Sequence, residues 1–378
     1  MELFICGNPR LLSGGKKAAN TNYCNAPRTV EALRDAKFVD STRLSPDDDP
    51  VASARFMGQV IHQGKASYHH TPPYNTFLRD GEWPSAGIEL ETHLRAFNLE
   101  FARQATQDMR SNWFHFERDG SLDRSHSGEY GYELITCPLP PRAYRDQRLW
   151  LGLQNLCNPY LQSFQCEETG LHVHVGLNQF EKFDAIPFSC EGDRRSIGKL
   201  LSTVVYYCIA DQAFVDRVAL RKPTGYCGPA DVPEFTDARR LVDTGTATGA
   251  ALVDYCAAAL MRHRGQWSRD AGNATSRVVR GNSADDIVWI GSDNYLASGH
   301  GTEINQEHEY TIEFRRAKGT MHALSIHRIV ELMTSVVRFA GKLCREPDFV
   351  ATRESFMDWL ISTTTSEALR NLAKQTKG

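Results

Sequence analysis

Three short segments of the sequence each carry two ionisable residues separated by one apolar residue. They read Glu89-Leu90-Glu91, His172-Val173-His174 and Glu313-Phe314-Arg315. Successive side chains of a β-strand point to opposite faces, so both members of each pair would share one face of a strand. The apolar residue between them would then point into a core, which leaves the ionisable pair on the face where chemistry can occur.

A fourth segment, Gly131-Tyr132-Glu133-Leu134-Ile135, adds another acid with the same alternation. If the four strands lie side by side, five side chains are expected to converge: Glu89, Glu91, Glu133, His172 and Glu313. That many carboxylates cannot all stay ionised at close range without a compensating cation. Mostly oxygen ligands with an imidazole suit Mg²⁺ or Mn²⁺ better than zinc, so the sequence predicts a site for one of these two ions.

Each pair also has an ordinary interpretation when it is taken alone. A Glu-x-Glu strand is usually a solvated face, His-x-His is also a common zinc arrangement, and Glu-x-Arg is usually a surface ion pair with little energetic consequence. The joint occurrence of the pairs, each with an apolar face behind it, is what favours a functional site.

The elements that would position these residues mix strands and helices without a regular βαβ rhythm. Strands are expected at 87–92, 113–117, 131–137, 170–177 and 309–316. Helices are expected at 94–105, around 149–153, at 198–214, at 250–261, at 321–337 and at 353–374. This mixture favours an α+β fold with a mainly antiparallel sheet flanked by helices.

Segments rich in turn-forming residues suggest how the chain is divided. Residues 1–80 are rich in Pro, Asn, Gly and Asp and are expected to form an irregular arm. Residues 81–378 would then form the catalytic domain, with a loop-rich insertion around 220–305. The segment Asp119-Gly120-Ser121 is expected to be a turn before the strand that carries Glu133.

Taken in order, four blocks of the sequence resemble the amidoligase family. The blocks are Gly87-Ile88-Glu89-Leu90-Glu91, Asp119-Gly120-Ser121-Leu122 with Gly131-Tyr132-Glu133-Leu134-Ile135, Gly170-Leu171-His172-Val173-His174-Val175, and Ile312-Glu313-Phe314-Arg315 with Gly319-Thr320. That family belongs with glutamine synthetase and glutamate-cysteine ligase among the carboxylate-amine ligases. The resemblance covers roughly residues 85–180 and 305–340.

The resemblance implies a glutamine synthetase-like antiparallel half-barrel that binds ATP. It implies that Glu89 and Glu91 are ligands of two different metal ions, with Glu133 joining the Glu91 site. His172 and Glu313 would complete the Glu89 site.

The resemblance also implies the contacts of the nucleotide. His174 would lie near it, and Arg315 would touch the phosphates or an acyl-phosphate intermediate. Asp119 matches the family's Asp-Gly-Ser turn, with a role toward metal or amine, so Arg315, Asp119 and Glu133 are the catalytic candidates. Arg316 and Lys318 are further candidate nucleotide contacts, although strand alternation favours Arg315, which shares a face with Glu313.

The expected function is therefore ATP-dependent formation of an amide bond, peptide or isopeptide, through an acyl phosphate, with Mg²⁺ held by sheet carboxylates. One alternative is a hydrolase in which His172 and His174 hold zinc; it predicts tightly bound zinc and no requirement for ATP. Another is a non-catalytic binding module, which clustered, mutually repelling acids disfavour and which metal titration would distinguish.

The composition argues against several other classes of protein. The 378 residues are 41% hydrophobic and 24% charged, and a formal charge of −3 gives no electrostatic reason to expect a nucleic-acid or membrane partner. Ten cysteines without a Cys-x-x-Cys pair argue against a zinc ribbon or a disulfide scaffold. With an early acid and no long apolar run at its start, the chain is expected to be cytoplasmic. Its expected partners are small-molecule or peptide carboxylates and amines, and a homo-oligomer stays open.

Overall fold

The computed structural model describes residues 84–95, 114–124, 129–136, 138–164, 169–188, 190–222, 235–270, 303–306, 308 and 310–377. Within this part the chain forms two compact units, the first from residues 85–173 and 317–327, the second from residues 84, 174–316 and 328–377. Strand β5 (Gly170–Gly176), strand β7 (Thr311–Lys318) and helix α11 (Ala323–Arg345) run from one unit into the other.

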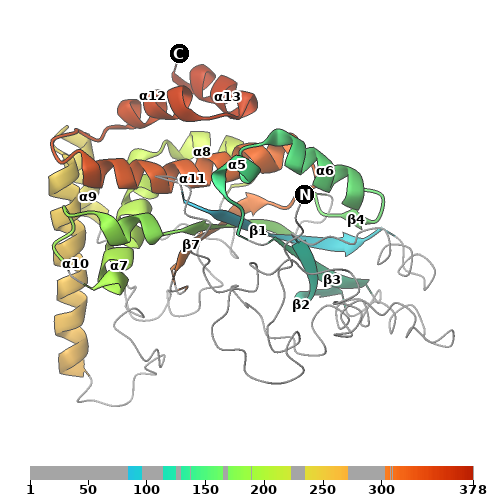
Figure 1. Cartoon of the computed structure of the whole chain (residues 1–378), viewed down its shortest axis with the longest axis horizontal. Helices are drawn as coiled ribbons and strands as arrows, with labels where there is room; N and C mark the ends of the chain where they lie inside the picture. Colours follow the sequence, from blue (N-terminus) through green and yellow to red (C-terminus); the bar gives the residue numbers. More distant parts are fainter. Residues whose placement is uncertain are drawn as a thin grey trace. The chain divides into compact units, whose positions relative to one another are not determined.

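The first unit contains strands in the order β2-β3-β1-β5, with β4 also paired to β1. The pairs β2-β3, β1-β3 and β1-β4 are antiparallel, and Figure 1 labels these four strands. The strands are β1 (Ala86–Leu94), β2 (Phe114–Arg124), β3 (Glu129–Thr136) and β4 (Leu161–Gln162). Leu90 of β1 lies opposite Leu134 of β3, and both side chains are buried. The apolar residues of β1 therefore face a core, as the alternation predicts, and its two glutamates lie on the other face.

Two helices follow β3 in the first unit, α5 (Pro141–Tyr144) and α6 (Gln147–Cys157). Asp146 begins α6 because its carboxylate accepts a hydrogen bond from the backbone N–H of Arg148 at 2.9 Å. The buried indole of Trp150 donates to the carbonyl of Tyr144 at 2.8 Å, which fixes α6 to the end of α5.

In the second unit β7 is paired with β5 and with β6 (Ile304–Asn305), so the order is β5-β7-β6. At one end of β5 the N–H of Leu177 donates to the carbonyl of Tyr310 at 3.0 Å. At its other end, in the first unit, the N–H of Gly319 donates to the carbonyl of Thr169 at 3.1 Å. The start of β5 therefore lies beside the end of β7, so the two strands are antiparallel. An α+β fold with an antiparallel sheet and flanking helices is thereby confirmed.

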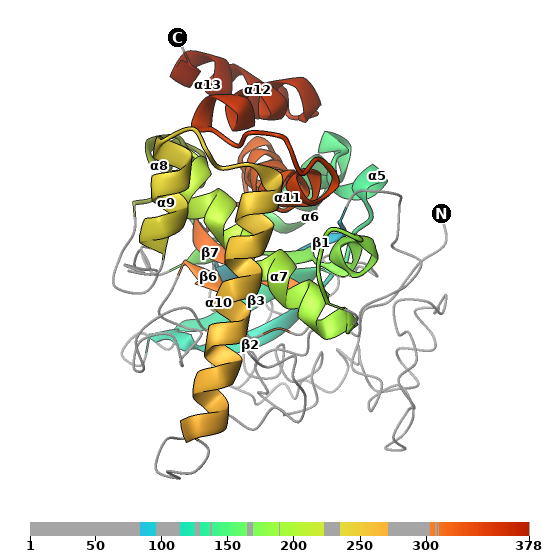
Figure 2. The same cartoon turned by 90° about the vertical axis from the view of Figure 1, so that its left-hand side faces the viewer.

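Most helices of the described residues belong to the second unit. They are a 3₁₀ turn at Asn178–Lys182, α7 (Glu191–Val204), a π-helical segment at Val205–Ile209, α8 (Gln212–Ala219), α9 (Phe235–Asp243), α10 (Gly249–Asp270), α12 (Arg353–Thr363) and α13 (Glu367–Lys377). Helix α10 packs beside α7 (Figure 2). Even Lys199 of α7 is buried, and its ammonium donates to the carbonyl of Gln306 at 3.0 Å.

The single helix expected at 198–214 is wrong. Helix α7 passes into the π-helical segment and ends at Ala210, whose backbone is extended. Asp211 then begins α8, because its carboxylate accepts from the N–H of Phe214 at 2.8 Å. A local N-cap thus divides a run that is apolar enough to suggest one buried helix.

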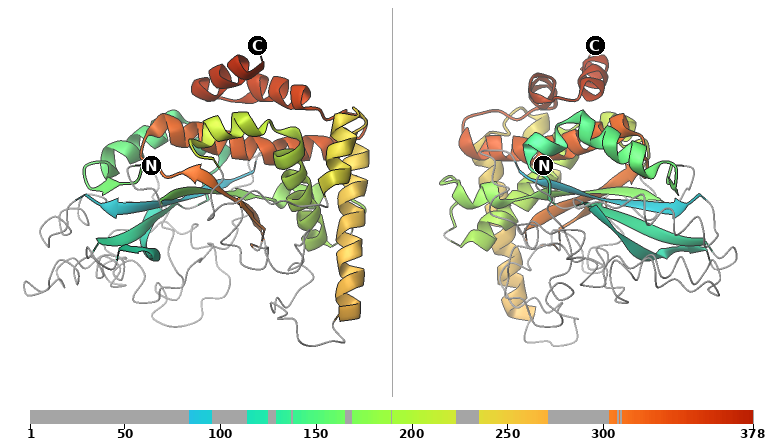
Figure 3. Two further views of the ribbon diagram at one scale, coloured as in Figure 1. Left: turned by 180° about the vertical axis from the view of Figure 1, so that it is seen from behind. Right: turned by 45° about the vertical axis from the view of Figure 1, so that its right-hand side comes forward.

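The single last helix expected at 353–374 is also wrong, because α12 and α13 are separate and lie together as a pair (Figure 3). Buried Glu331 of α11 binds the connection between them. Its carboxylate accepts from the hydroxyl of Thr364 at 2.8 Å and from the N–H and hydroxyl of Thr365 at 3.0 and 3.1 Å. These contacts stabilise an extended backbone where the helix would otherwise continue.

The remaining predictions divide between the described residues and the rest of the chain. The strands expected around β1, β3, β5 and β7 and the helix that becomes α11 are confirmed, and β2 and α10 are longer than expected. The turn expected at Asp119-Gly120-Ser121 is wrong, because these residues lie within β2, where Asp119 pairs with Gly131 before an irregularity in register. The arm at 1–80, most of the helix at 94–105 and much of the insertion at 220–305 lie outside the described residues. The domain boundaries stay a prediction.

None of the helices formed by the described residues has the length and apolar character needed to cross a membrane.

Candidate active site and metal centres

A first cluster of buried polar side chains lies in the first unit, on β1, β3 and β5. Glu91 and Glu133 are directly opposite each other in the antiparallel register of β1 and β3, and both are less than a tenth exposed. Residues paired in this way have Cβ atoms about 4.5–5.5 Å apart, so the two carboxylates share one face at short range. The cluster is thus a direct consequence of strand register.

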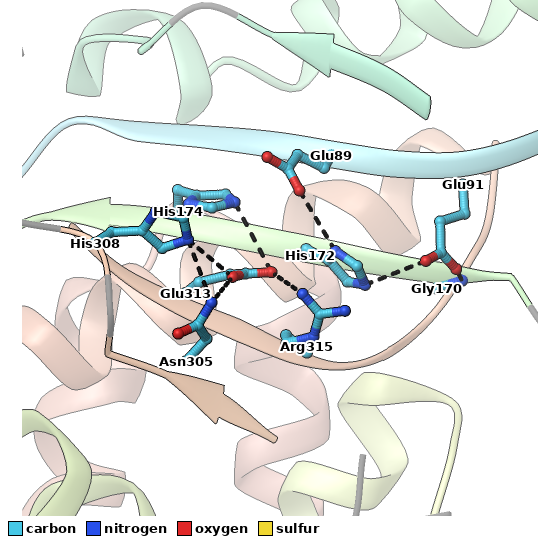
Figure 4. A network of polar contacts seen from close by, with 9 residues as sticks. All are labelled: Glu89, Glu91, Gly170, His172, His174, Asn305, His308, Glu313 and Arg315. Carbon is cyan, nitrogen blue, oxygen red and sulfur yellow. Dashed lines mark hydrogen bonds and ion pairs between the residues drawn. The ribbon is translucent and has the colours of Figure 1, made fainter. Parts of the chain in front are cut away.

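His172 of β5 links this cluster to both glutamates of β1 (Figure 4). Its Nε2 lies 3.6 Å from Oε1 of Glu91, and its Nδ1 lies 3.5 Å from Oε2 of Glu89. One ligand atom from each of Glu91, Glu133 and His172 can be chosen so that all lie within 4.8 Å of one another. This spacing and a donor set of carboxylates with one imidazole fit a divalent cation of the Mg²⁺ or Mn²⁺ type.

Gly170 at the start of β5 is part of this arrangement. Its backbone N–H donates to Oε2 of Glu91. A Cβ atom at this position would lie 3.1 Å from Oε2 of Glu91 and 3.1 Å from Nε2 of His172. The absence of a side chain therefore lets the carboxylate and the imidazole approach the backbone of β5.

A second cluster lies in the second unit around Glu313 of β7, whose side chain is fully buried. Its Oε1 accepts from Nη1 of Arg315 at 2.7 Å, and its Oε2 accepts from Nδ2 of Asn305 at 2.8 Å (Figure 4). Nε2 of His308 lies 3.1 Å from Oε2, and Nε2 of His174 lies 4.0 Å from Oε1. His174, His308 and Glu313 form another group whose ligand atoms lie within 4.8 Å of one another.

Two members of the second cluster were missed by the sequence analysis. Asn305 lies opposite Glu313 in the register of β6 and β7, and His308 comes from the connection between these strands. The only local signal is that both lie a few residues before Glu313 in a polar stretch. In the first unit, the register also places Glu117 of β2 opposite Glu133, a position that the sequence analysis did not select.

Arg316 is not brought to the second cluster. Its guanidinium pairs with Glu303 at 3.0 Å and also contacts Asp216 and Gln212, so it is bound away from Glu313. Burial opposes the charged form of Arg316, but Tyr206 and the neighbouring carboxylates raise its pKa. Burial raises the pKa of Glu303 above its ordinary value, and the opposing charge of Arg316 offsets only part of this shift. Strand alternation explains the result, since adjacent residues of β7 point to opposite faces.

The other predicted residues are placed less closely. Lys318 lies at the end of β7 in the first unit and is half-buried. Asp119 lies in β2, in the register described above, and its side chain is outside what the structure describes. The roles assigned to Lys318 and Asp119 stay predictions.

The fold and its two clusters define an α+β protein with an antiparallel sheet that presents buried groups of potential metal ligands. In structure the chain is similar to part of a bifunctional glutathione synthetase from Pasteurella multocida, with 12% sequence identity and a TM-score of 0.33. The match includes 78% of this chain, which spans less than half, 46%, of that protein. No protein-family model and no curated protein matches the chain.

Proposed function

We propose that the chain is an ATP-dependent carboxylate-amine ligase. The observation that carries the proposal is the buried pair Glu91 and Glu133, held opposite each other by strand register with His172 beside them. Two carboxylate charges within 4.8 Å of each other repel by at least about 3.5 kcal/mol at an effective dielectric constant of about 20. A fold retains such a pair at low cost when a divalent cation binds between the carboxylates.

In this proposal Glu91, Glu133 and His172 hold Mg²⁺ or Mn²⁺. Glu89 contacts the other imidazole nitrogen, Nδ1 of His172, at 3.5 Å. The ion would neutralise phosphate oxygens and orient them. A substrate carboxylate would attack the γ-phosphorus of ATP, releasing ADP and forming an acyl phosphate. An amine would then attack the acyl carbon, form the amide and release inorganic phosphate and a proton.

Arg315 and His174 are the proposed contacts of the nucleotide. Arg315 is held by Glu313, which fixes the direction of a planar guanidinium suited to phosphate oxygens. Strand β5 carries His174 two residues after His172, so one strand supplies an imidazole to each cluster. The proposal omits Arg316, because that guanidinium already binds Glu303 and Asp216.

A zinc hydrolase based on both His172 and His174 receives less support. Among the described residues, each group of potential metal ligands contains one of these two histidines and none contains both.

The proposal is tested by measuring ADP release from MgATP with pools of amino acids, polyamines and short peptides. We expect ADP only when a carboxylate and an amine are both present, and loss of at least about 100-fold of this activity in Glu133→Gln. Glu367→Gln, which changes an exposed glutamate of α13, is the matched control and should retain activity. Equal activity of Glu133→Gln and the wild type would refute the proposal.

A further inference from the structure

His308 has no role in the proposed ligase reaction, yet its imidazole is held beside Glu313, the buried carboxylate of the second cluster. The side chains of His174 and His308 are each 10% exposed, whereas that of Glu313 is 0% exposed. The two imidazole rings are 4.9 Å apart between centroids and meet edge to face. Two nitrogen donors and one carboxylate thus converge at the margin of a buried site (Figure 4).

The chemistry of these donors differs from that of the first cluster. Two imidazoles and one carboxylate form the ligand set of many zinc sites that keep a fourth position open. Ligands of a tetrahedral ion with bonds of about 2.0–2.1 Å lie about 3.3 Å apart. Nε2 of His308 lies 3.1 Å from Oε2 of Glu313, and Nε2 of His174 lies 4.0 Å from Oε1. One ligand atom of each residue lies within 4.8 Å of the other two, which is close to the spacing that such an ion needs.

The carboxylate of Glu313 is also oriented as a ligand should be. Asn305 donates to its Oε2 and Arg315 donates to its Oε1. Each carboxylate oxygen has two lone pairs, so both oxygens can accept these hydrogen bonds and one can still bind an ion. Hydrogen bonds of this kind to a ligand fix its direction and are part of most metal sites.

We propose that His174, His308 and Glu313 bind a second divalent cation, of the borderline-soft class to which Zn²⁺ and Co²⁺ belong. Three protein donors leave the fourth position of a tetrahedral ion for water or a substrate atom. The site shares His174 with the proposed nucleotide contacts but no donor with Glu91, Glu133 or His172, so its metal binding can be measured without ATP.

Direct metal binding tests this site without ATP. The Glu133→Gln protein, in which the first cluster is weakened, is freed of metal with a chelator and titrated with Zn²⁺ by calorimetry in excess Mg²⁺. Co²⁺ is then added as a spectroscopic probe, because a tetrahedral site gives visible d–d absorption. We expect one equivalent of Zn²⁺ to bind and Co²⁺ to colour the protein.

His308→Gln separates a metal ligand from a hydrogen-bond partner. Glutamine can still donate a hydrogen bond to Glu313 but is a poor ligand for zinc. Loss of a residue that only orients a ligand weakens metal binding about 10–100-fold, so loss of a ligand itself should weaken it by at least about 100-fold. His322→Ala, which removes an exposed histidine, is the control and should bind as the parent does.

Three results would overturn the inference: equal Zn²⁺ affinity in His308→Gln and its parent, no Zn²⁺ binding by the parent, or complete displacement of Zn²⁺ by Mg²⁺. Circular dichroism establishes that the variants are folded. A protein that binds Zn²⁺ here but releases no ADP would retain this inference and refute only the ligase.

Discussion

Replacement of Glu133 by glutamine should make the metal-free protein more stable. It should also reduce the stability that the protein gains when Mg²⁺ is added. Glu91 and Glu133 are paired across β1 and β3, and both are buried. With ligand atoms no more than 4.8 Å apart, their repulsion is at least about 3.5 kcal/mol at an effective dielectric constant of about 20. Glutamine removes one charge and keeps the size of the side chain, but its amide must also be desolvated.

The free energy of unfolding in a chelator should therefore rise by about 1–3 kcal/mol in Glu133→Gln. In Mg²⁺ at 100 times its dissociation constant, the wild type should gain about 2.7 kcal/mol. The variant should lose most of that gain, so the stability difference between the two proteins should shrink or change sign when Mg²⁺ is added.

Urea unfolding at pH 8, with chelator or with Mg²⁺, measures both effects through the transition midpoint at unchanged slope. Glu367→Gln serves as a control for the loss of one negative charge from an exposed position. A variant that is less stable than the wild type in chelator, or that retains the full response to Mg²⁺, would show that Glu133 is not held against Glu91 as a metal ligand.

Three further perturbations test other parts of the fold. Glu331→Gln should lower the free energy of unfolding by about 2–3 kcal/mol in urea, since the connection between α12 and α13 loses a charged acceptor; an unchanged midpoint would contradict this. Gly249→Ala should cost about 1–3 kcal/mol in thermal unfolding, because a Cβ atom would lie 2.3 Å from the carbonyl oxygen of Leu343; wild-type stability would mean that α10 begins differently. Cys190→Ser should remove one fast-reacting thiol from a chromogenic thiol titration at pH 8, because Cys190 is exposed. Burial raises the pKa of Cys256 well above its ordinary value, so that thiol stays neutral at pH 8 and reacts slowly. An unchanged number of fast-reacting thiols in the variant would refute this.

Strand alternation predicted the part of the site that depends on residues two positions apart on one strand. Glu89 and Glu91 share a face because they are two residues apart on β1, and this relation needs no knowledge of tertiary structure. Glu133 could be added because its own strand shows the same alternation. The pairing of Glu91 with Glu133 was expected only from the family resemblance, because strand alternation leaves the register open and a shift by one residue would move every side chain to the other face.

The residues that were missed depend on contacts between distant segments. Asn305 reaches Glu313 only through the register of β6 and β7, and His308 only through the connection between them. In the same way, Glu303 and Asp216 bind Arg316 from positions 13 and 100 residues away, which no local pattern encodes. The broken helices have a similar origin, because Glu331 holds the connection between α12 and α13 from another helix.

The two clusters differ in what should drive ion binding. In the first, opposed carboxylates favour any small divalent cation by charge, so affinity should depend mainly on the number of negative charges that remain. In the second, Glu313 already has Arg315 as a counter-charge at 2.7 Å, so a further cation gains little from charge alone. The two imidazoles must supply the affinity there, and they favour zinc over magnesium. Arg315→Gln keeps an N–H donor that can orient Glu313 but removes its positive counter-charge, so zinc binding should become stronger. An oxygen-rich site that depends on other residues should not respond, and zinc titration of this variant measures the difference.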